Sequence, residues 1–366
     1  MNKYTIRIVG LLLACAVLLG LPGCRKTARD AENAVVTTNF ALYDLARQAY
    51  PGAVVMLLSP GTESHDFECT LSDIATIAHA SLVLYVGGEG DDWMDAVLAR
   101  VAESGSPVPY LRAMDVIAGE SELLHEAEAL ESDGHDHEHD HAHEHEHEHE
   151  HDHEHDHEDA HDHDHGTYLT ATEAISHKNT AVYVHTDPPT DSDSYDGYDE
   201  HVWTDPANAI LLLHAVRDAL ASLDLPTADT AAYENRLLEV DAGFRALASS
   251  GEIEQLLFAD RFPFLYFAHA YDVAYTAAFA GCSSDTEPSL ATLSRLLAEM
   301  DETDPAAIFV IEFSDRKTAE FLSSAHPCRI IELSSGHNVT KADFDAGVTL
   351  ADLCERNLAA LRDLSR

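Results

Sequence analysis

The chain carries 25 histidines among 366 residues, and neutral imidazole is the commonest side-chain ligand of transition metals. Fifteen of them fall between His135 and His165, where they alternate with fourteen Asp or Glu residues. This tract has no apolar face to bury, so we expect a disordered loop that binds several divalent ions weakly; a solubilising insert is the alternative. Residues 143–147 also match the H-E-x-x-H motif of zinc proteases, but alternation alone produces this match, and we reject it.

Two histidines outside the tract stand where chemistry is expected in an α/β protein. His65 follows a predicted strand at 54–58, and His201 immediately precedes a predicted helix. Ligands of open α/β sheets bind in the crevice beyond the carboxyl ends of the strands, so both side chains could reach one ion. On position alone, each would more often be an ordinary surface or capped histidine.

The elements that must position these residues alternate between strands and helices. Strands are predicted at 34–38, 54–58 and 82–86, with helices at 40–49 and 71–79 between them, which indicates a parallel sheet. Asp205 and Pro206 suit the start of a helix at 207–223, and a second helical stretch covers 228–248. The alternation resumes with strands that include 307–311 and 329–333, helices that include 317–325, and a closing helix at 343–361.

This pattern predicts an α/β protein of two lobes with parallel sheets, joined by one long helix. The expected divisions are a signal peptide at 1–23, a linker at 24–33, an N-terminal lobe at 34–227 with an acidic histidine-rich loop at 120–168, a connecting helix at 228–249 and a C-terminal lobe at 250–366. Residues 186–200, rich in Asp, Ser, Pro and Tyr, are predicted to form a second solvated loop.

The amino terminus has the order of a secretory signal: Lys3 and Arg7, then an apolar run at 8–21 that is too short to span a membrane. The sequence LPGC at 21–24 resembles the lipobox of bacterial lipoproteins. Lipid on Cys24 would hold the mature protein at the outer face of the bacterial cytoplasmic membrane. A plainly secreted form is the alternative.

Charge and cysteine content agree with export and with metal binding. A formal net charge of −45, from 21 Lys and Arg against 66 Asp and Glu, opposes nucleic-acid binding and favours cations. Outside the cytosol the remaining cysteines could form one or two disulfides, and the sequence leaves the pairing open. These are Cys69, Cys282, Cys328 and Cys354. No CxxC spacing occurs, which disfavours a thiolate zinc site.

Two motifs carry a resemblance to a known family. The sequences GTESHDF at 61–67 and HVWTDP at 201–206 are similar to those of metal-specific solute-binding proteins of ABC importers, of the high-affinity zinc uptake receptor type. The resemblance covers nearly all of the mature chain, the acidic histidine-rich loop included. It implies two α/β lobes bridged by a rigid helix, an ion held between them by His65 and His201, and an ABC permease as partner.

The second lobe departs from the family pattern. The family's third histidine would stand within the stretch DRFPFLY at 260–266, where this chain has Arg261, and an arginine does not ligate a cation. Asp260 could substitute, whereas His269 is expected on a helix surface. Glu312 aligns with the family's acidic ligand after the strand at 307–311; an N-cap or solvated carboxylate is the alternative.

His337 is predicted to replace the missing histidine. It lies in SGHNVT at 335–340, between the strand at 329–333 and the last helix, and Gly336 would let the backbone approach closely. A helix-capping loop residue is the alternative. The predicted ligand set is His65, His201, Glu312 and His337.

The function predicted from these residues is capture of Zn²⁺ outside the membrane, by a monomer, and delivery to an ABC permease. Histidine ligands with one carboxylate suit zinc, whereas manganese sites use more oxygen; nickel and copper also accept imidazole. A receptor for Mn²⁺ or Ni²⁺ import is a weaker alternative, and a metal buffer or chaperone that passes metal to another protein is the main one. A metallohydrolase would need an open position for water and a general base. No such base is identifiable, so we do not expect an enzyme.

Overall fold

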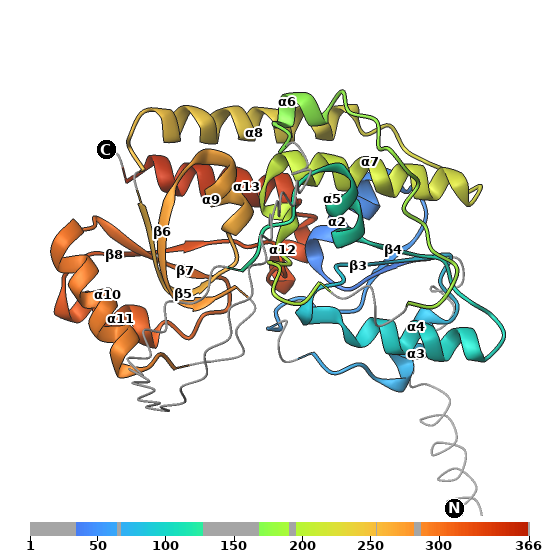
Figure 1. The fold of residues 1–366 in the computed structure, drawn as a ribbon, viewed down its shortest axis with the longest axis horizontal. Helices are drawn as coiled ribbons and strands as arrows, with labels where there is room; N and C mark the ends of the chain where they lie inside the picture. The colour runs from blue at the N-terminus through green and yellow to red at the C-terminus, as the bar shows by residue number, and fades with distance from the viewer. Residues whose placement is uncertain are drawn as a thin grey trace, which may run out of the picture.

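The computed structural model describes residues 34–63, 67–126, 168–189, 195–253, 255–281 and 287–364. The predicted signal peptide, Cys24, His65, Cys282 and the histidine tract lie outside these residues. Two parallel four-stranded sheets form two lobes, which lie side by side in Figure 1. The predicted fold class, two α/β lobes with parallel sheets, is confirmed.

The first sheet has the strand order β2-β1-β3-β4, and all of its pairings are parallel. The strands are β1 (Val35–Thr37), β2 (Val54–Met56), β3 (Leu82–Tyr85) and β4 (Tyr110–Arg112). Every residue of the central strands β1 and β3 is buried, as expected of a sheet with helices on both faces. The sequence predicted β1, β2 and β3, but not the three-residue β4.

Several helices of the first lobe are capped at their N-termini by a side chain that accepts a hydrogen bond from a backbone amide. Asn39 accepts a hydrogen bond from the Leu42 amide and starts α2 where a helix was predicted. Thr70 and Asp73 form a capping box at α3. The helices are α2 (Phe40–Ala49), α3 (Leu71–Ile77), α4 (Trp93–Glu103), α5 (Ala113–Glu120), α6 (Ala171–Ala174) and α7 (Pro206–Ser222).

Helix α7 is the central helix of the first lobe. Asp205 caps it by accepting a hydrogen bond from the Ala207 amide, and Pro206 takes the first helical position, as predicted. Its apolar side chains are buried on all sides, including the unbroken run from Ala209 to Leu213. The segment just before α7 is therefore anchored to a rigid core.

The second sheet has the order β6-β5-β7-β8, again all parallel. Its strands are β5 (Gln255–Phe262), β6 (Ala274–Ala280), β7 (Ala307–Ile311) and β8 (Arg329–Leu333). The helices between them are α9 (Leu265–Tyr271), α10 (Leu290–Thr303) and α11 (Lys317–Ala325). The bounds of β7, β8 and α11 match those predicted from the sequence.

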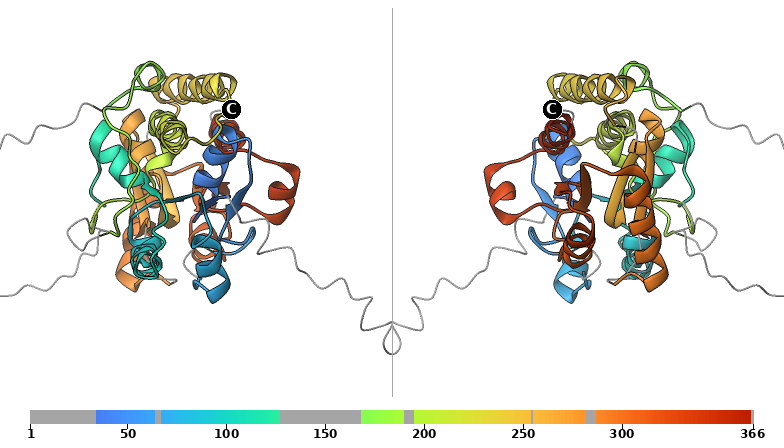
Figure 2. Two further views of the ribbon diagram at one scale, coloured as in Figure 1. Left: turned by 90° about the vertical axis from the view of Figure 1, so that its right-hand side faces the viewer. Right: turned by 90° about the vertical axis from the view of Figure 1, so that its left-hand side faces the viewer.

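Helix α8 (Ala231–Ser249) lies across both lobes. Tyr233 and Leu237 in its first half belong to the core of the first lobe. Val240, Phe244 and Leu247 in its second half belong to the core of the second lobe. The side views in Figure 2 show α7 and α13 (Leu350–Arg362) beneath it.

The predicted closing helix at 343–361 is wrong as a single element. It is two helices, α12 (Lys341–Ala346) and α13, because Gly347 adopts a φ of +74° at the end of α12. Thr349 then starts α13 with a capping box to Asp352. Around this break, Val339, Val348 and Leu353 pack against Phe40 of α2, so the end of the chain returns to the first lobe.

The predicted loops are more ordered at their ends than the sequence suggested. Asp199 and Glu200, placed by prediction in a solvated loop, are each 1% exposed because that segment pairs with the chain around Leu124. Glu120, the predicted first residue of the histidine-rich loop, is buried at the end of α5. Its carboxylate accepts hydrogen bonds from Thr180 and Tyr183.

The three described cysteines, Cys69, Cys328 and Cys354, are free thiols. A framework of two disulfides would need at least one bond among these three, so that alternative is not found. Within the described part of the chain, no helix combines the length and the apolar character needed to cross a membrane.

Candidate metal centre

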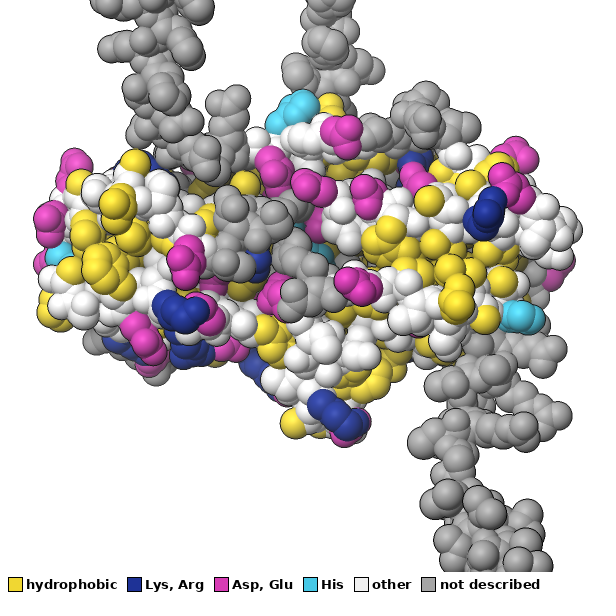
Figure 3. Space-filling view, turned by 90° about the horizontal axis from the view of Figure 1, so that it is seen from below, with side chains coloured by type: hydrophobic (Ala, Val, Ile, Leu, Met, Phe, Trp, Pro, Cys, Tyr) yellow, Lys and Arg dark blue, Asp and Glu magenta, His cyan; other side chains and the backbone are white. Residues whose placement is uncertain are grey.

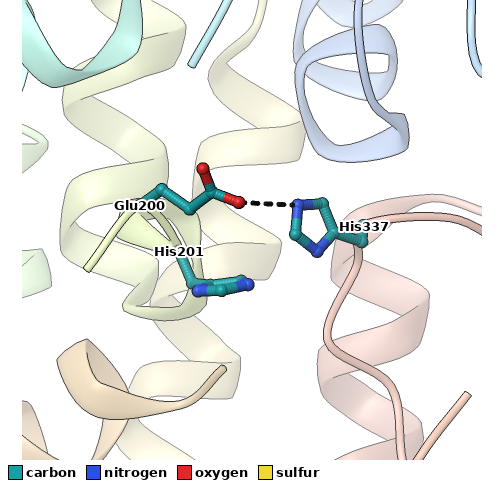
Figure 4. A group of neighbouring side chains, drawn as sticks. All are labelled: Glu200, His201 and His337. Atoms are coloured by element: carbon teal, nitrogen blue, oxygen red, sulfur yellow. Dashed lines mark ion pairs between the residues drawn. The ribbon is translucent and has the colours of Figure 1, made fainter. Parts of the chain in front are cut away.

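Three side chains converge between the lobes: Glu200, His201 and His337 (Figure 4). Among the described residues, they form a group whose potential ligand atoms all lie within 4.8 Å of one another. Glu200 and His201 come just before the 3-10 helix Val202–Thr204 that leads into α7. His337 comes from the other lobe, in the connection between β8 and α12.

The backbone before α7 is fixed by long-range hydrogen bonds. The Asp199 amide donates to the Leu124 carbonyl (2.9 Å), and the Tyr266 hydroxyl of α9 donates to the Asp199 carbonyl (3.0 Å). The buried Trp203 indole donates to the Ser335 carbonyl (2.8 Å). The bonds from Tyr266 and to Ser335 join the two lobes at the point where the ligand atoms meet.

His201 is oriented by Asp199. Its Nδ1 lies 3.2 Å from Asp199 Oδ1, and its backbone amide donates to the same oxygen (2.8 Å). When Asp199 accepts from Nδ1, the neutral ring presents the lone pair of Nε2, as in the carboxylate–histidine arrangements of zinc sites. Burial is the largest influence on the pKa of His201 and lowers it, but the charges of Asp199 and Glu200 outweigh burial and raise the pKa.

His337 is held through its backbone as well as its ring. Its carbonyl accepts a hydrogen bond from the Phe40 amide (2.8 Å), and its own amide donates to Ser335 Oγ (3.2 Å). The ring centroid lies 4.7 Å from that of His201 and 5.0 Å from that of Trp203. The two imidazoles thus stand edge to face within reach of one ion.

Glu200 is the third member, and it is 1% exposed. Burial raises its pKa to about 7, the positive charge of a protonated His201 opposes this rise, and Asp91 adds to it. Oε2 accepts from the Gly90 amide (2.7 Å), and Oε1 lies 3.6 Å from His337 Nε2. Prediction from the sequence missed Glu200 because residues 186–200 were taken for a solvated loop; the signal was the run of two acids directly before His201.

Glu312 stands at the end of β7, where the sequence placed it, and lines the same pocket as His201 and His337. It is 8% exposed, and burial raises its pKa. Both carboxylate oxygens already accept hydrogen bonds from Ser335: Oε1 from Oγ (2.5 Å) and Oε2 from the amide (2.7 Å). Glu312 is not a member of the three-residue group.

The two alternative ligands of the second lobe, Asp260 and His269, and the arginine at the family's histidine position lie at different places. Arg261 lines the pocket, and its Nη1 lies 3.6 Å from Glu63 Oε1 of the first lobe. Asp260 is buried beside it and accepts from the Arg261 amide, but it does not line this pocket. His269 is an exposed residue of α9 whose ring lies against Tyr168. The structure therefore brings His337, and neither Asp260 nor His269, to His201.

The electrostatic setting favours a cation. On the face drawn in Figure 3, acidic side chains occur across the middle of the molecule as well as at its ends. The whole chain has a formal charge of −45, and a field of one sign raises the local concentration of counter-ions. Two imidazoles and a carboxylate are ligand types that zinc accepts in its four-coordinate sites.

A family model described as "ZnuA: Zinc-uptake complex component A periplasmic" matches residues 35–364. The chain belongs to the ZnuA family. Membership confirms the resemblance seen in the motifs around His65 and His201.

The known relatives that resemble this chain are distant from it in sequence. The chain is 25% identical over 363 residues to "Zinc-binding lipoprotein AdcA" of Streptococcus pneumoniae, with 97% of this chain and 60% of the relative covered. It thus spans about 60% of the length of that protein. It is 23% identical to "High-affinity zinc uptake system protein ZnuA" of Bacillus subtilis, with 96% of this chain and 95% of the relative covered.

Solved structures share the ZnuA-type fold. The Zn(II)-bound ZnuA-like domain of S. pneumoniae AdcA has a TM-score of 0.59 at 21% identity and covers 91% of this chain and 99% of its own. The periplasmic zinc binding protein TroA of Treponema pallidum has a TM-score of 0.59 at 18% identity, with 91% and 99% covered. These likenesses show a common fold of two lobes.

Proposed function

We propose that this protein is an extracytoplasmic receptor that captures Zn²⁺ between its lobes and delivers it to the permease of an ABC importer. The observation that carries the proposal is the meeting of His201 and His337, one from each lobe, with ligand atoms within 4.8 Å of one another and of a buried carboxylate. Membership in the ZnuA family supports zinc as the cargo. The relatives named for zinc binding support it further.

The chemistry of the donors supports zinc over harder cations. Imidazole nitrogen suits Zn²⁺, whereas Mn²⁺ and Mg²⁺ prefer oxygen ligands. His201 and His337 supply the nitrogens in this proposal, and His65, which lies outside the described residues, is proposed as a further ligand on the strength of its motif. The protein acts as a binding protein and catalyses no reaction.

The same proposal includes the location. Cys24, in the sequence LPGC at 21–24, carries lipid that holds the mature protein at the outer face of the cytoplasmic membrane. It works there as a monomer that docks on the permease. Mass spectrometry of the membrane-bound protein tests the anchor, because a diacylglyceryl group on Cys24 is expected and an unmodified cysteine would contradict it.

Uptake of radioactive zinc by cells tests the receptor function directly. Cells that lack the protein should accumulate zinc more slowly at low external zinc, and the full chain should restore uptake. The double variant His201→Ala/His337→Ala should not restore it. Uptake that is unaffected by loss of the protein, with tight zinc binding retained in vitro, would reject the importer and favour the buffer or chaperone.

A further inference from the structure

Within the described structure, Glu200 is buried and has one carboxylate oxygen without a hydrogen-bond donor. Its Oε2 accepts from the Gly90 amide, but among the described residues Oε1 accepts no hydrogen bond. Leaving a buried polar group unsatisfied costs about 1–3 kcal/mol, and more for a charged one. A bound cation would compensate this cost.

The surroundings of Glu200 are shaped to hold its side chain. A Cβ atom on Gly88 would come within 2.4 Å of Glu200 Cβ, and one on Gly90 within 2.6 Å of Oε1. Residues without side chains are therefore needed at both positions. The Gly90 amide then fixes Oε2, so that Oε1 points toward His337 Nε2, 3.6 Å away (Figure 4).

Glu312 is the acidic ligand expected from the resemblance to the family. Its carboxylate oxygens differ from Glu200 Oε1 because both already accept hydrogen bonds. Both of its oxygens accept hydrogen bonds from Ser335. Ser335 Oγ in turn accepts from the His337 amide (3.2 Å). The carboxylate of Glu312 thus orders the turn that carries His337, and it does so through Ser335.

We propose that Glu200, together with His201 and His337, supplies the oxygen ligand of the captured Zn²⁺, and that Glu312 positions His337. This assignment rests on the proposed function and names the carboxylate of the same site. The two imidazoles and one carboxylate fill three of zinc's four positions. Two of these ligands are adjacent in the sequence, and the third comes from the opposite lobe.

The test compares Glu200→Gln with the matched variant Glu312→Gln in the full mature chain. Zinc affinity is measured by competition with a chromophoric chelator strong enough to strip the weak sites of the histidine tract. Glu200→Gln should weaken binding by roughly 100-fold or more, whereas Glu312→Gln should cost roughly tenfold, as for a residue that orients a ligand. Glu200→Asp should recover part of the loss, because the charge returns.

Cobalt spectroscopy separates a ligand from a structural residue. The visible absorption of one equivalent of Co²⁺ depends on the donor atoms, so Glu200→Gln should change the spectrum and Glu312→Gln should leave it as in the wild type. Unchanged affinity and spectrum in Glu200→Gln would overturn the assignment. A wild-type chain without any tight zinc site would instead overturn the proposed function itself.

A measurement on the wild-type protein makes the test independent of how the variants fold. In a zinc-bound crystal structure, the anomalous peak should lie about 2.0–2.2 Å from Glu200 Oε1. A peak at bonding distance from Glu312 and not from Glu200 would overturn the assignment.

Discussion

Arg261 of β5 reaches across the interlobe pocket and pairs with Glu63 of the first lobe, with Nη1 and Oε1 3.6 Å apart. The side chain of Arg261 is 11% exposed and that of Glu63 is 25% exposed, so the pair is partly shielded from water. A fixed positive charge therefore stands where the family pattern would place a neutral histidine. Glu63 offsets this charge, which otherwise would repel a divalent cation.

Replacing Arg261 should strengthen metal binding. Arg261→Ala removes the positive charge and leaves that of Glu63, so the pocket becomes more negative and zinc affinity should rise several-fold. Glu63→Gln should have the opposite effect. Arg316→Ala, which removes an exposed arginine paired with Glu332, is the matched control and should leave affinity unchanged. Calorimetry on the three variants decides, and weaker binding by Arg261→Ala would contradict the electrostatic argument.

Removing a predicted histidine of the first lobe should abolish the tight site. His65→Ala or His201→Ala, each made after deletion of residues 134–166, should reduce zinc affinity by roughly 100-fold or more while circular dichroism stays native. The loss follows from the missing nitrogen ligand. Parental affinity in either variant would remove that residue from the ligand set.

His337 should supply the second lobe's nitrogen. His337→Ala should weaken zinc binding strongly at pH 7.5, and the difference from the parent should shrink as pH falls, because protons compete with metal for the parent's imidazole. His269→Ala, on the exposed face of α9, is the control and should bind as the parent does. An unchanged affinity for His337→Ala, with a large loss for Asp260→Ala, would move the ligand to Asp260.

Deleting residues 134–166 should separate weak sites from the tight one. The tract holds most of the chain's histidines but none of the interlobe candidates, so the shortened protein should bind fewer ions in total and keep one that survives chelator competition. Metal analysis after equilibrium dialysis gives the count. A shortened protein that binds no zinc would show that the tract takes part in the tight site.

Asp205 predicts a pH dependence of stability. It is fully buried, it caps α7, and burial raises its pKa to about 7 from an ordinary value near 4. The folded state therefore holds the proton more tightly than the unfolded state. Its contribution to stability is present in full below about pH 4 and is lost as pH rises toward 7.

Asp205→Asn keeps a capping side chain but does not ionise. The unfolding free energy of the wild type relative to this variant should fall by up to about 1.4 kcal/mol per pH unit between about pH 4 and pH 7. Urea unfolding at several pH values measures it. Parallel pH profiles for the two proteins would show that Asp205 does not titrate in this window.

Much of the fold could be predicted from the sequence. The correct predictions fall on elements whose local sequence signals agree with their packing in the structure. The bounds of α2, β7, β8 and α11 follow from caps and from apolar runs of the right length. The strand β4 was missed because its sequence, Tyr-Leu-Arg, has no β-branched residue, whereas the equally short β1 and β2 each contain two valines. The single closing helix was wrong because Gly347 interrupts an otherwise continuous helical pattern.

The residues of the candidate site also differ in how far the sequence could predict them. The positions of His201, Glu312 and His337 follow from one rule, that side chains at the carboxyl ends of parallel strands and at the following helix meet in one crevice. Glu200 could not be found by that rule. Its burial depends on Gly88 and Gly90, more than a hundred residues away in sequence, and on the pairing of its segment with Leu124, none of which a local pattern encodes.

The segment around His337 is tied to the first lobe at several points. Phe40 donates to the His337 carbonyl, Gly61 donates to the Val339 carbonyl, and Asn338 Nδ2 donates to the carbonyls of Ser59 and Thr62. This segment can move away from the first lobe only after these bonds open. We therefore expect the residence time of zinc to be set by local unfolding of one short stretch, so that the metal dissociation rate and the amide exchange rate of this stretch rise together with temperature.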